Sequence, residues 1–93
     1  MKIGDRVELT VTVAGISTYN VKDRYNDTTS TLYRHSLRDA DNRLYVYSGV
    51  QLRIRTGQRV RLRGTVKRYE NDYGMVRLSR IKLIETDVQE GML

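Results

Sequence analysis

Residues 58–68 read QRVRLRGTVKR, and this stretch decides the fold. Val60, Leu62 and Val66 lie an even number of positions apart, and most residues between them are Arg, Thr or Lys. Alternation with a period of two is typical of a β-strand with one face in the core and the other in solvent. Gly64 marks a position at which such a strand can bend. We expect the outer face of this strand to carry Arg59, Arg61, Arg63, Thr65 and Lys67.

Four further segments read as strands by the same criterion. They span residues 6–16, 32–38, 44–48 and 75–84. Within the last segment, Val76 and Leu78 share one parity whereas Ile81 and Leu83 take the other. This phase slip predicts a β-bulge near residues 79–80. Gly15, near the end of the first segment, likewise marks a bulge or a sharp bend.

The connections between these strands differ in character. Residues 17–31 read STYNVKDRYNDTTST, a polar stretch that we expect to be a long loop. Residues 39–42 are Asp-Ala-Asp-Asn, which supply turn chemistry between the second and third strands. Residues 49–57 have extended rather than helical spacing, so we expect no helix there.

Composition and strand number together predict an all-β protein with one domain. Val, Ile, Thr and Tyr supply 31 of the 93 residues and Ala only 2, which is a strand-forming composition. Five strands, bend glycines and a long first connection favour a closed or partly open five-stranded Greek-key barrel, the OB-fold, with little or no helix. An SH3-like barrel is the alternative. We expect the barrel to span residues 1–85 and a short, acidic, flexible tail to follow at residues 86–93.

The charge distribution indicates a polyanionic partner. The formal net charge is +6, with 13 Arg against 4 Lys. Residues 42–69 contain no Asp or Glu, and such a positive run is typical of proteins that contact a phosphate backbone. The alternative is that a modest positive charge only aids solubility. For the arginines of the 58–68 strand a structural role is equally open, because its outer face would lie beside Glu8, Thr10 and Thr12.

The hairpin at residues 32–48 carries the most informative candidate site. Toward the core we expect Leu37, Leu44 and Val46, with Tyr33 and His35 on the inner side of their strand. The outer face then carries Arg34, Ser36, Arg38, Tyr45 and Tyr47. Bases stack on aromatic rings and guanidinium groups bind phosphates, so this face is predicted to bind an oligonucleotide. Ordinary cross-strand pairing of Tyr and Arg on a solvated sheet is the alternative.

Two loops are expected to flank this face and to add contacts. In an OB-fold barrel the loops after the first and fourth strands border the binding face. The predicted loop contacts are Tyr19 and Tyr25 in the first loop and Lys67, Arg68, Tyr69 and Tyr73 around the second. The alternative is that one tyrosine of each pair folds back to cap an end of the barrel.

Catalysis and metal binding find little support in the sequence. The chain has one His and no Cys, which excludes disulfides and thiolate metal sites. His35 has no nucleophilic partner, and Asp39 and Asp41 are placed as turn formers. We expect no enzyme activity, cofactor or metal. No apolar run approaches a membrane span and the N-terminus lacks a signal-peptide core, so we expect no membrane partner and a cytoplasmic location.

Two short motifs carry a resemblance to a known family. They are LRGTVK at residues 62–67 and LSRIK at residues 78–82, within the stretch 57–85. This stretch resembles the last two strands of small OB-fold single-stranded-DNA-binding proteins of bacteriophages and mobile genetic elements. Residues 4–13 and 33–48 fit the family more loosely. Its third strand often carries Trp or Phe, where this chain has Tyr45 and Tyr47.

The candidate face and the resemblance together lead to a functional hypothesis. It is single-stranded DNA binding, largely independent of sequence, through neutralisation of backbone charge and stacking on Tyr, in DNA replication or recombination. A helicase, primase, polymerase or recombinase would then be a protein partner. An RNA-binding, translation-associated domain is one alternative, since stacking and phosphate contacts do not distinguish the sugars. A protein-interaction module of a helicase or polymerase complex is the other.

Overall fold

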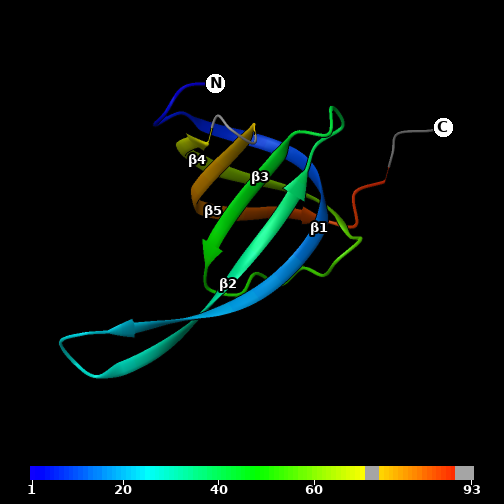
Figure 1. The fold of residues 1–93 in the computed structure, drawn as a ribbon. Coiled ribbons are helices and arrows are strands. Elements are labelled where there is room, and N and C mark those ends of the chain that lie inside the picture. The colour runs from blue at the N-terminus through cyan, green and yellow to red at the C-terminus, as the bar shows by residue number, and fades with distance from the viewer. Residues whose placement is uncertain (71–73, 90–93) are drawn as a thin grey trace.

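The computed structural model describes residues 1–70 and 74–89 and is built from β-strands (Figure 1). The strands are β1 (Arg6–Asp23), β2 (Thr28–Arg38), β3 (Leu44–Gly49), β4 (Arg59–Glu70) and β5 (Met75–Thr86). The described residues contain no helix, and hence none long and apolar enough to cross a membrane. The all-β prediction is confirmed, and all five predicted strands are present.

The five strands are hydrogen-bonded neighbours in a closed ring, in the order β1-β2-β3-β5-β4. Neighbouring strands are antiparallel except β3 and β5, which run parallel. β1 closes the ring because it has two partners: residues 6–12 pair with β4, and from Thr12 onward the strand pairs with β2. In Figure 1 this long strand curves around one side of the ring to reach both partners.

The core lies inside the ring and follows the alternation of the strands. Val60, Leu62 and Val66 of β4 are buried, as their spacing predicted. Val11 and Val13 of β1 belong to the same buried cluster. The other members of this core cluster are Leu37, Tyr45, Ile54, Val76 and Leu78. Because burial of an aliphatic side chain contributes about 1.5–3 kcal/mol, this small cluster is the main source of stability for the ring.

The outer face of β4 lies beside β1, which agrees with the alternative that its arginines have a structural role. Arg59, Arg61 and Arg63 register opposite Thr12, Thr10 and Glu8. The Arg63 guanidinium lies 3.1 Å from the carboxylate of Glu8, and that of Arg61 lies 3.0 Å from the carboxylate of Glu85 on β5. Arg61 and Arg63 are therefore ion-paired on the wall formed by β1, β4 and β5.

Both predicted irregularities are present. The register between β1 and β2 shifts at residues 13–15, where Gly15 lies. In β5, residues 79–82 pair with only residues 63–65 of β4, so β5 carries one extra residue there. Arg80 accommodates it with a φ of 52°, in the left-handed region that non-glycine residues seldom adopt. The bulge lets the apolar residues on both sides of it face inward, as the phase slip predicted.

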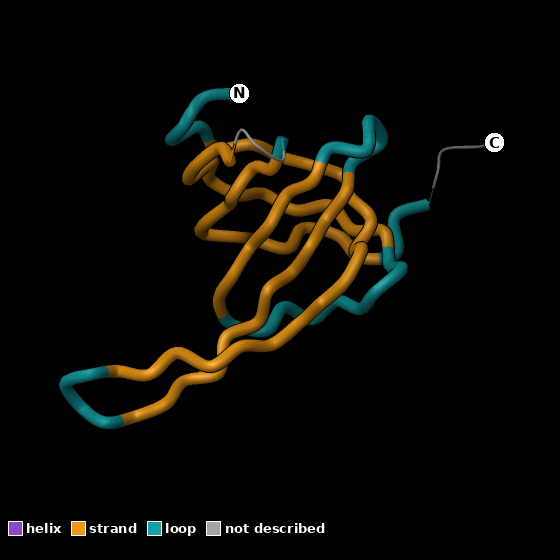
Figure 2. Tube along the Cα trace, in the orientation of Figure 1, coloured by secondary structure: helices purple, strands orange, loops and turns teal. Residues whose placement is uncertain are grey.

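The polar stretch 17–31, expected to be a loop, is instead most of a two-stranded ribbon. β1 and β2 remain paired from Ile16 and His35 as far as Asp23 and Thr28. The ribbon projects away from the ring (Figure 2), and we call residues 18–32 the arm. The loop prediction was wrong because Thr, Val and Tyr favour extended structure even where no core selects an apolar face. The polarity of the stretch reflects a solvated ribbon, not an irregular connection.

Two further segments complete the described chain. Residues 50–58 join β3 to β4 without regular structure, as expected, and we call them the β3–β4 connection. At the other end, β5 extends to Thr86, and the backbone N–H of Val88 donates to the carbonyl of Arg59 at 3.0 Å. The first residues of the predicted tail are therefore attached to the ring. Residues 90–93 lie outside the described residues.

Candidate nucleic-acid interface

The outer face of β2 presents the predicted basic side chains. Arg34 and Arg38 are exposed, and Ser36 between them is half-buried. Nη1 of Arg38 donates to the carbonyl of Asn42 at 3.1 Å, which positions this side chain against the β2–β3 turn. Within residues 1–70 and 74–89 the guanidinium of Arg34 has no hydrogen-bond or ion-pair partner. Neither β2 nor β3 contains an acidic residue, so this face offers its charge to an anionic ligand.

Tyr45, predicted to lie on this outer face, is in the core. It is 2% exposed and registers opposite Leu37, so the two side chains share the inner side. Its hydroxyl donates to Oδ2 of Asp39 at 3.0 Å. The prediction was wrong because it turned the apolar Leu44 and Val46 toward the core, whereas the pairing of Arg38 with Leu44 across the loop 39–43 sets Tyr45 opposite the buried Leu37. Pairing fixes the face in this way because a shift of register by one residue would move every side chain of the returning strand to the opposite face.

The same inversion affects the rest of β3. Tyr47 registers opposite His35 on the inner side and stacks on its ring, with centroids 5.5 Å apart and planes at 28°. Leu44 and Val46, expected in the core, point outward, and Val46 is buried but outside the core cluster. The predicted stacking platform of Tyr45 and Tyr47 on the hairpin face is therefore wrong.

His35 has the structural role that the sequence predicted. It is fully buried, and the backbone N–H of Leu52 donates to its Nε2 at 3.1 Å. Because Nε2 accepts, the ring proton lies on Nδ1, which donates to the carbonyl of Tyr47 at 3.1 Å. Burial lowers the pKa of His35, against the opposing effect of the hydrogen bond to Tyr47. The neutral imidazole therefore fastens β2 to the β3–β4 connection.

Exposed aromatic rings lie on the arm instead. Ser17 registers opposite Arg34, and Tyr19 is the next residue of β1 on the same face, 40% exposed. Ser17, Thr18, Tyr19 and Arg34 line a hollow of about 280 Å³, which we call the arm-base surface. A phenol ring and a guanidinium in one hollow can stack a base and bind a phosphate. Tyr25 lies at the tip of the arm and is 97% exposed.

The residues predicted around the second loop divide into three groups. Lys67 and Arg68 are exposed near the end of β4. Tyr69 is half-buried against the core cluster, and its hydroxyl donates to the carbonyl of Met1. It therefore packs on the ring. This agrees with the alternative that one tyrosine of the pair in this loop folds back to cap an end of the barrel. Tyr73 lies outside the described residues.

One basic residue of the outer face was missed from the sequence. Arg77 of β5 registers opposite Val46 on β3 and opposite Arg68 on β4. It therefore lies in an outward row that crosses β3, β5 and β4. The signal was its place between Val76 and Leu78, whose inward direction was predicted and is confirmed.

The described residues hold no group of three or more His, Asp or Glu side chains placed to bind a metal ion. Comparison of the chain with protein-family models, curated proteins and solved structures finds no match. Function must therefore be argued from the geometry of the arm-base surface and the outer face of the ring.

Proposed function

We propose that this protein is an OB-fold single-stranded-DNA-binding protein of the kind encoded by bacteriophages and mobile genetic elements. The support for the fold is the strand order, in which β5 lies between β3 and β4 beside a three-stranded antiparallel meander. This order supports the OB-fold, which is a five-stranded Greek-key barrel. In that fold the face of the second and third strands and the adjacent loops bind oligonucleotides.

The observation that carries the proposal is the arm-base surface. Arg34 has no partner within the described residues, and the exposed ring of Tyr19 lies on the same face of the same strand pair. A phosphate needs a cation that no carboxylate already neutralises, and a stacked base needs an open ring face. A duplex hides its base faces, so this combination favours a single strand.

The outer face extends this contact with charge. Arg38, Arg68 and Arg77 lie on the same side of the sheet as Arg34 and would neutralise phosphates along the strand. Phosphate contacts carry no sequence information, and every base offers a face for stacking, so binding is largely independent of sequence. Such binding protects or organises single strands for a helicase, primase, polymerase or recombinase during replication or recombination.

The test compares two arginine variants that remove the same charge. Fluorescence anisotropy of labelled oligo-dT across a salt series measures affinity for Arg34→Gln and for Arg63→Gln. We expect Arg34→Gln to weaken binding and to make the log–log salt slope shallower by about 0.7, the value for one phosphate contact on a single strand. Arg63 is already paired with Glu8 on the far wall, so its removal should leave the slope close to that of the wild type. A larger change for Arg63→Gln than for Arg34→Gln would show that the strand follows β4 and that the site is misplaced.

A further inference from the structure

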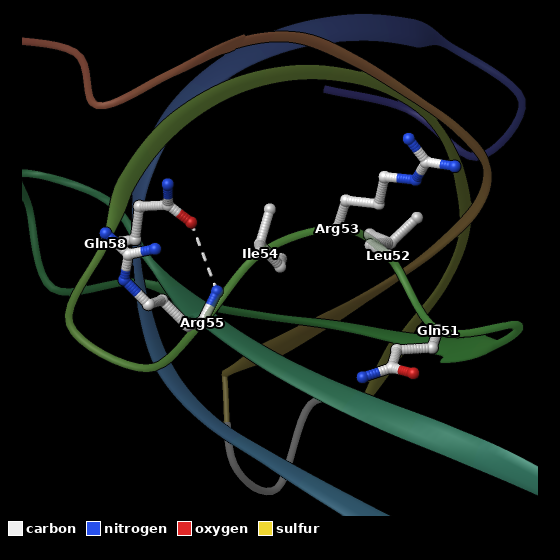
Figure 3. A pocket seen from close by; sticks show the side chains of 6 residues that line it. All are labelled: Gln51, Leu52, Arg53, Ile54, Arg55 and Gln58. Carbon is white, nitrogen blue, oxygen red and sulfur yellow. Dashed lines mark hydrogen bonds between the residues drawn. The ribbon is translucent and has the colours of Figure 1, made fainter.

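The β3–β4 connection forms a hollow of its own at one end of the ring. In Figure 3 the connection crosses the ring, and the side chains of six residues border the hollow. Its volume is about 430 Å³, and the lining residues are Gln51, Leu52, Arg53, Ile54, Arg55 and Gln58. Four of these six side chains are amides or guanidiniums, so the hollow is a polar and basic surface.

This segment is held in place although it has no regular structure. Its centre is anchored by Ile54, which belongs to the core cluster, and by Leu52, whose N–H donates to His35. Its far end is joined to β1 by two backbone hydrogen bonds, from Gly57 to Val13 at 2.8 Å and from Val13 to Gln58 at 2.9 Å. A binding segment fixed in this way loses little conformational entropy when a ligand binds.

The hydrogen bonds of the connection described here do not involve the guanidinium groups of its arginines. Oε1 of Gln58 accepts from the backbone N–H of Arg55 at 3.1 Å, and its Nε2 donates to Asp87 at 3.0 Å. The guanidinium groups of Arg53 and Arg55 are exposed and have no partner within the described residues. The carboxylate of Asp87 is therefore engaged by this amide.

A second hollow continues the first along the end of the ring. Its volume is about 540 Å³, and it shares Arg55 and Gln58 with the first. The connection and the arm also begin together, because Gly49, the last residue of β3, pairs with Tyr33 next to Arg34. A strand that leaves the arm-base surface at this end of the ring therefore meets a basic, preformed groove.

We propose that the β3–β4 connection is a second phosphate-binding segment, in which Arg53 and Arg55 take the phosphates of a single strand that extends past the arm-base surface. The inference rests on the proposed function, since it concerns the path of the same ligand. It predicts that the connection contributes only when the oligonucleotide is long enough to reach it.

The test is a length series. Labelled oligo-dT of about 4 to about 16 nucleotides, the range of site sizes for one such domain, is titrated with the wild type and with the double variant Arg53→Gln, Arg55→Gln. We expect the longest oligonucleotides to lose roughly three- to tenfold in affinity and about 1.4 in salt slope, as for two lost phosphate contacts. The shortest should bind as tightly as they bind the wild type.

The control variant, Lys2→Gln with Lys82→Gln, removes the same charge at sites away from the connection. A loss in the arginine variant no greater than in this control would overturn the inference, as would an equal loss at every length. Wild-type protein that binds no oligonucleotide of any length would instead overturn the proposed function itself. Both substituted arginines are exposed, so thermal melting should show an unchanged fold.

Discussion

Asp39 shows how one side chain connects a turn to the core. Its Oδ1 accepts from the backbone N–H groups of Asp41 and Arg43, each at 2.9 Å, and so shapes the loop between β2 and β3. Its Oδ2 accepts from the hydroxyl of Tyr45. Burial raises the pKa of Tyr45, and the hydrogen bond to Asp39 raises it further, so the phenol remains a donor. The turn and the inner side of β3 are therefore held by the same carboxylate.

The first prediction follows from this contact. Tyr45→Phe keeps the ring in the core and removes only the hydroxyl, so we expect a loss of about 1 kcal/mol in the free energy of unfolding, measured in urea. Affinity for oligo-dT should be unchanged, because the ring does not reach the outer face. Unchanged stability together with weaker DNA binding would instead indicate that Tyr45 lies on the exposed face.

The second prediction concerns His35 and pH. Protonation would place a hydrogen on Nε2, against the N–H of Leu52, and the pKa of His35 is lowered in the folded state. The unfolded chain therefore binds the proton more readily, so stability is fully present above the ordinary pKa of about 6.5 and falls as pH drops below it. Thermal melting from pH 7.5 to 5 should show this decline.

The matched variant for that experiment is His35→Gln. It lacks the titrating group, so its melting temperature should vary less over the same pH range even if it is lower throughout. A wild type whose stability is flat between pH 7.5 and 5, or a variant with the same decline, would contradict the neutral, buried imidazole.

At the scale of elements, the arm is the feature on which the proposed function depends most. It is a two-stranded ribbon without a core, and its exposed rings are free to meet a ligand. Tyr19→Ala should cost about 1–3 kcal/mol in oligo-dT binding, the usual value of one stacked base, and should leave thermal stability nearly unchanged. Thr29→Ala is the control, because Thr29 registers opposite Lys22 on the other face of the arm. Equal losses from the two variants would mean that the arm contributes without stacking.

Much of the ring was predictable because its alternation was unambiguous. The 58–68 stretch has apolar residues of one parity only, so the inward side of β4 followed from spacing. The bulge of β5 followed from the change of parity between Leu78 and Ile81. β3 was not predictable in this way, because Leu44, Tyr45, Val46 and Tyr47 are apolar or aromatic at both parities. Its face depends on the length of the turn, which the sequence does not determine.

The candidate site was predictable to a smaller extent. The outward direction of Arg34 and Arg38 followed from their odd separation from Leu37, which was predicted to face the core. Tyr19 was predicted as a ligand contact because it lies in a long polar segment. That this segment is a paired ribbon, which brings Tyr19 beside Arg34, depends on register between distant residues. Sequence reasoning placed Arg53 and Arg55 in the positive run 42–69 but not in the candidate site, because only the folded chain reveals that they have no partner among the described residues.

For the whole molecule, the positions of the charged side chains matter as much as the net charge. The net charge is +6, but the wall formed by β1, β4 and β5 is partly neutralised by Glu8 and Glu85. Arg34, Arg53 and Arg55, unlike Arg61 and Arg63, have no partner within the described residues. These are the three arginines that the proposed single strand would meet at the base of the arm and along the β3–β4 connection.

The most direct test of the account compares single-stranded and duplex DNA of equal length with the wild-type protein. Fluorescence anisotropy at moderate salt should give an affinity for oligo-dT roughly tenfold or more above that for the duplex, since only unpaired bases can stack on Tyr19. On an oligonucleotide too short to reach the β3–β4 connection, four phosphate contacts, at Arg34, Arg38, Arg68 and Arg77, should give a log–log salt slope of about −3. Equal affinity for the two forms would contradict the account, because charge alone would then explain binding and the arm-base surface would have no stacking role.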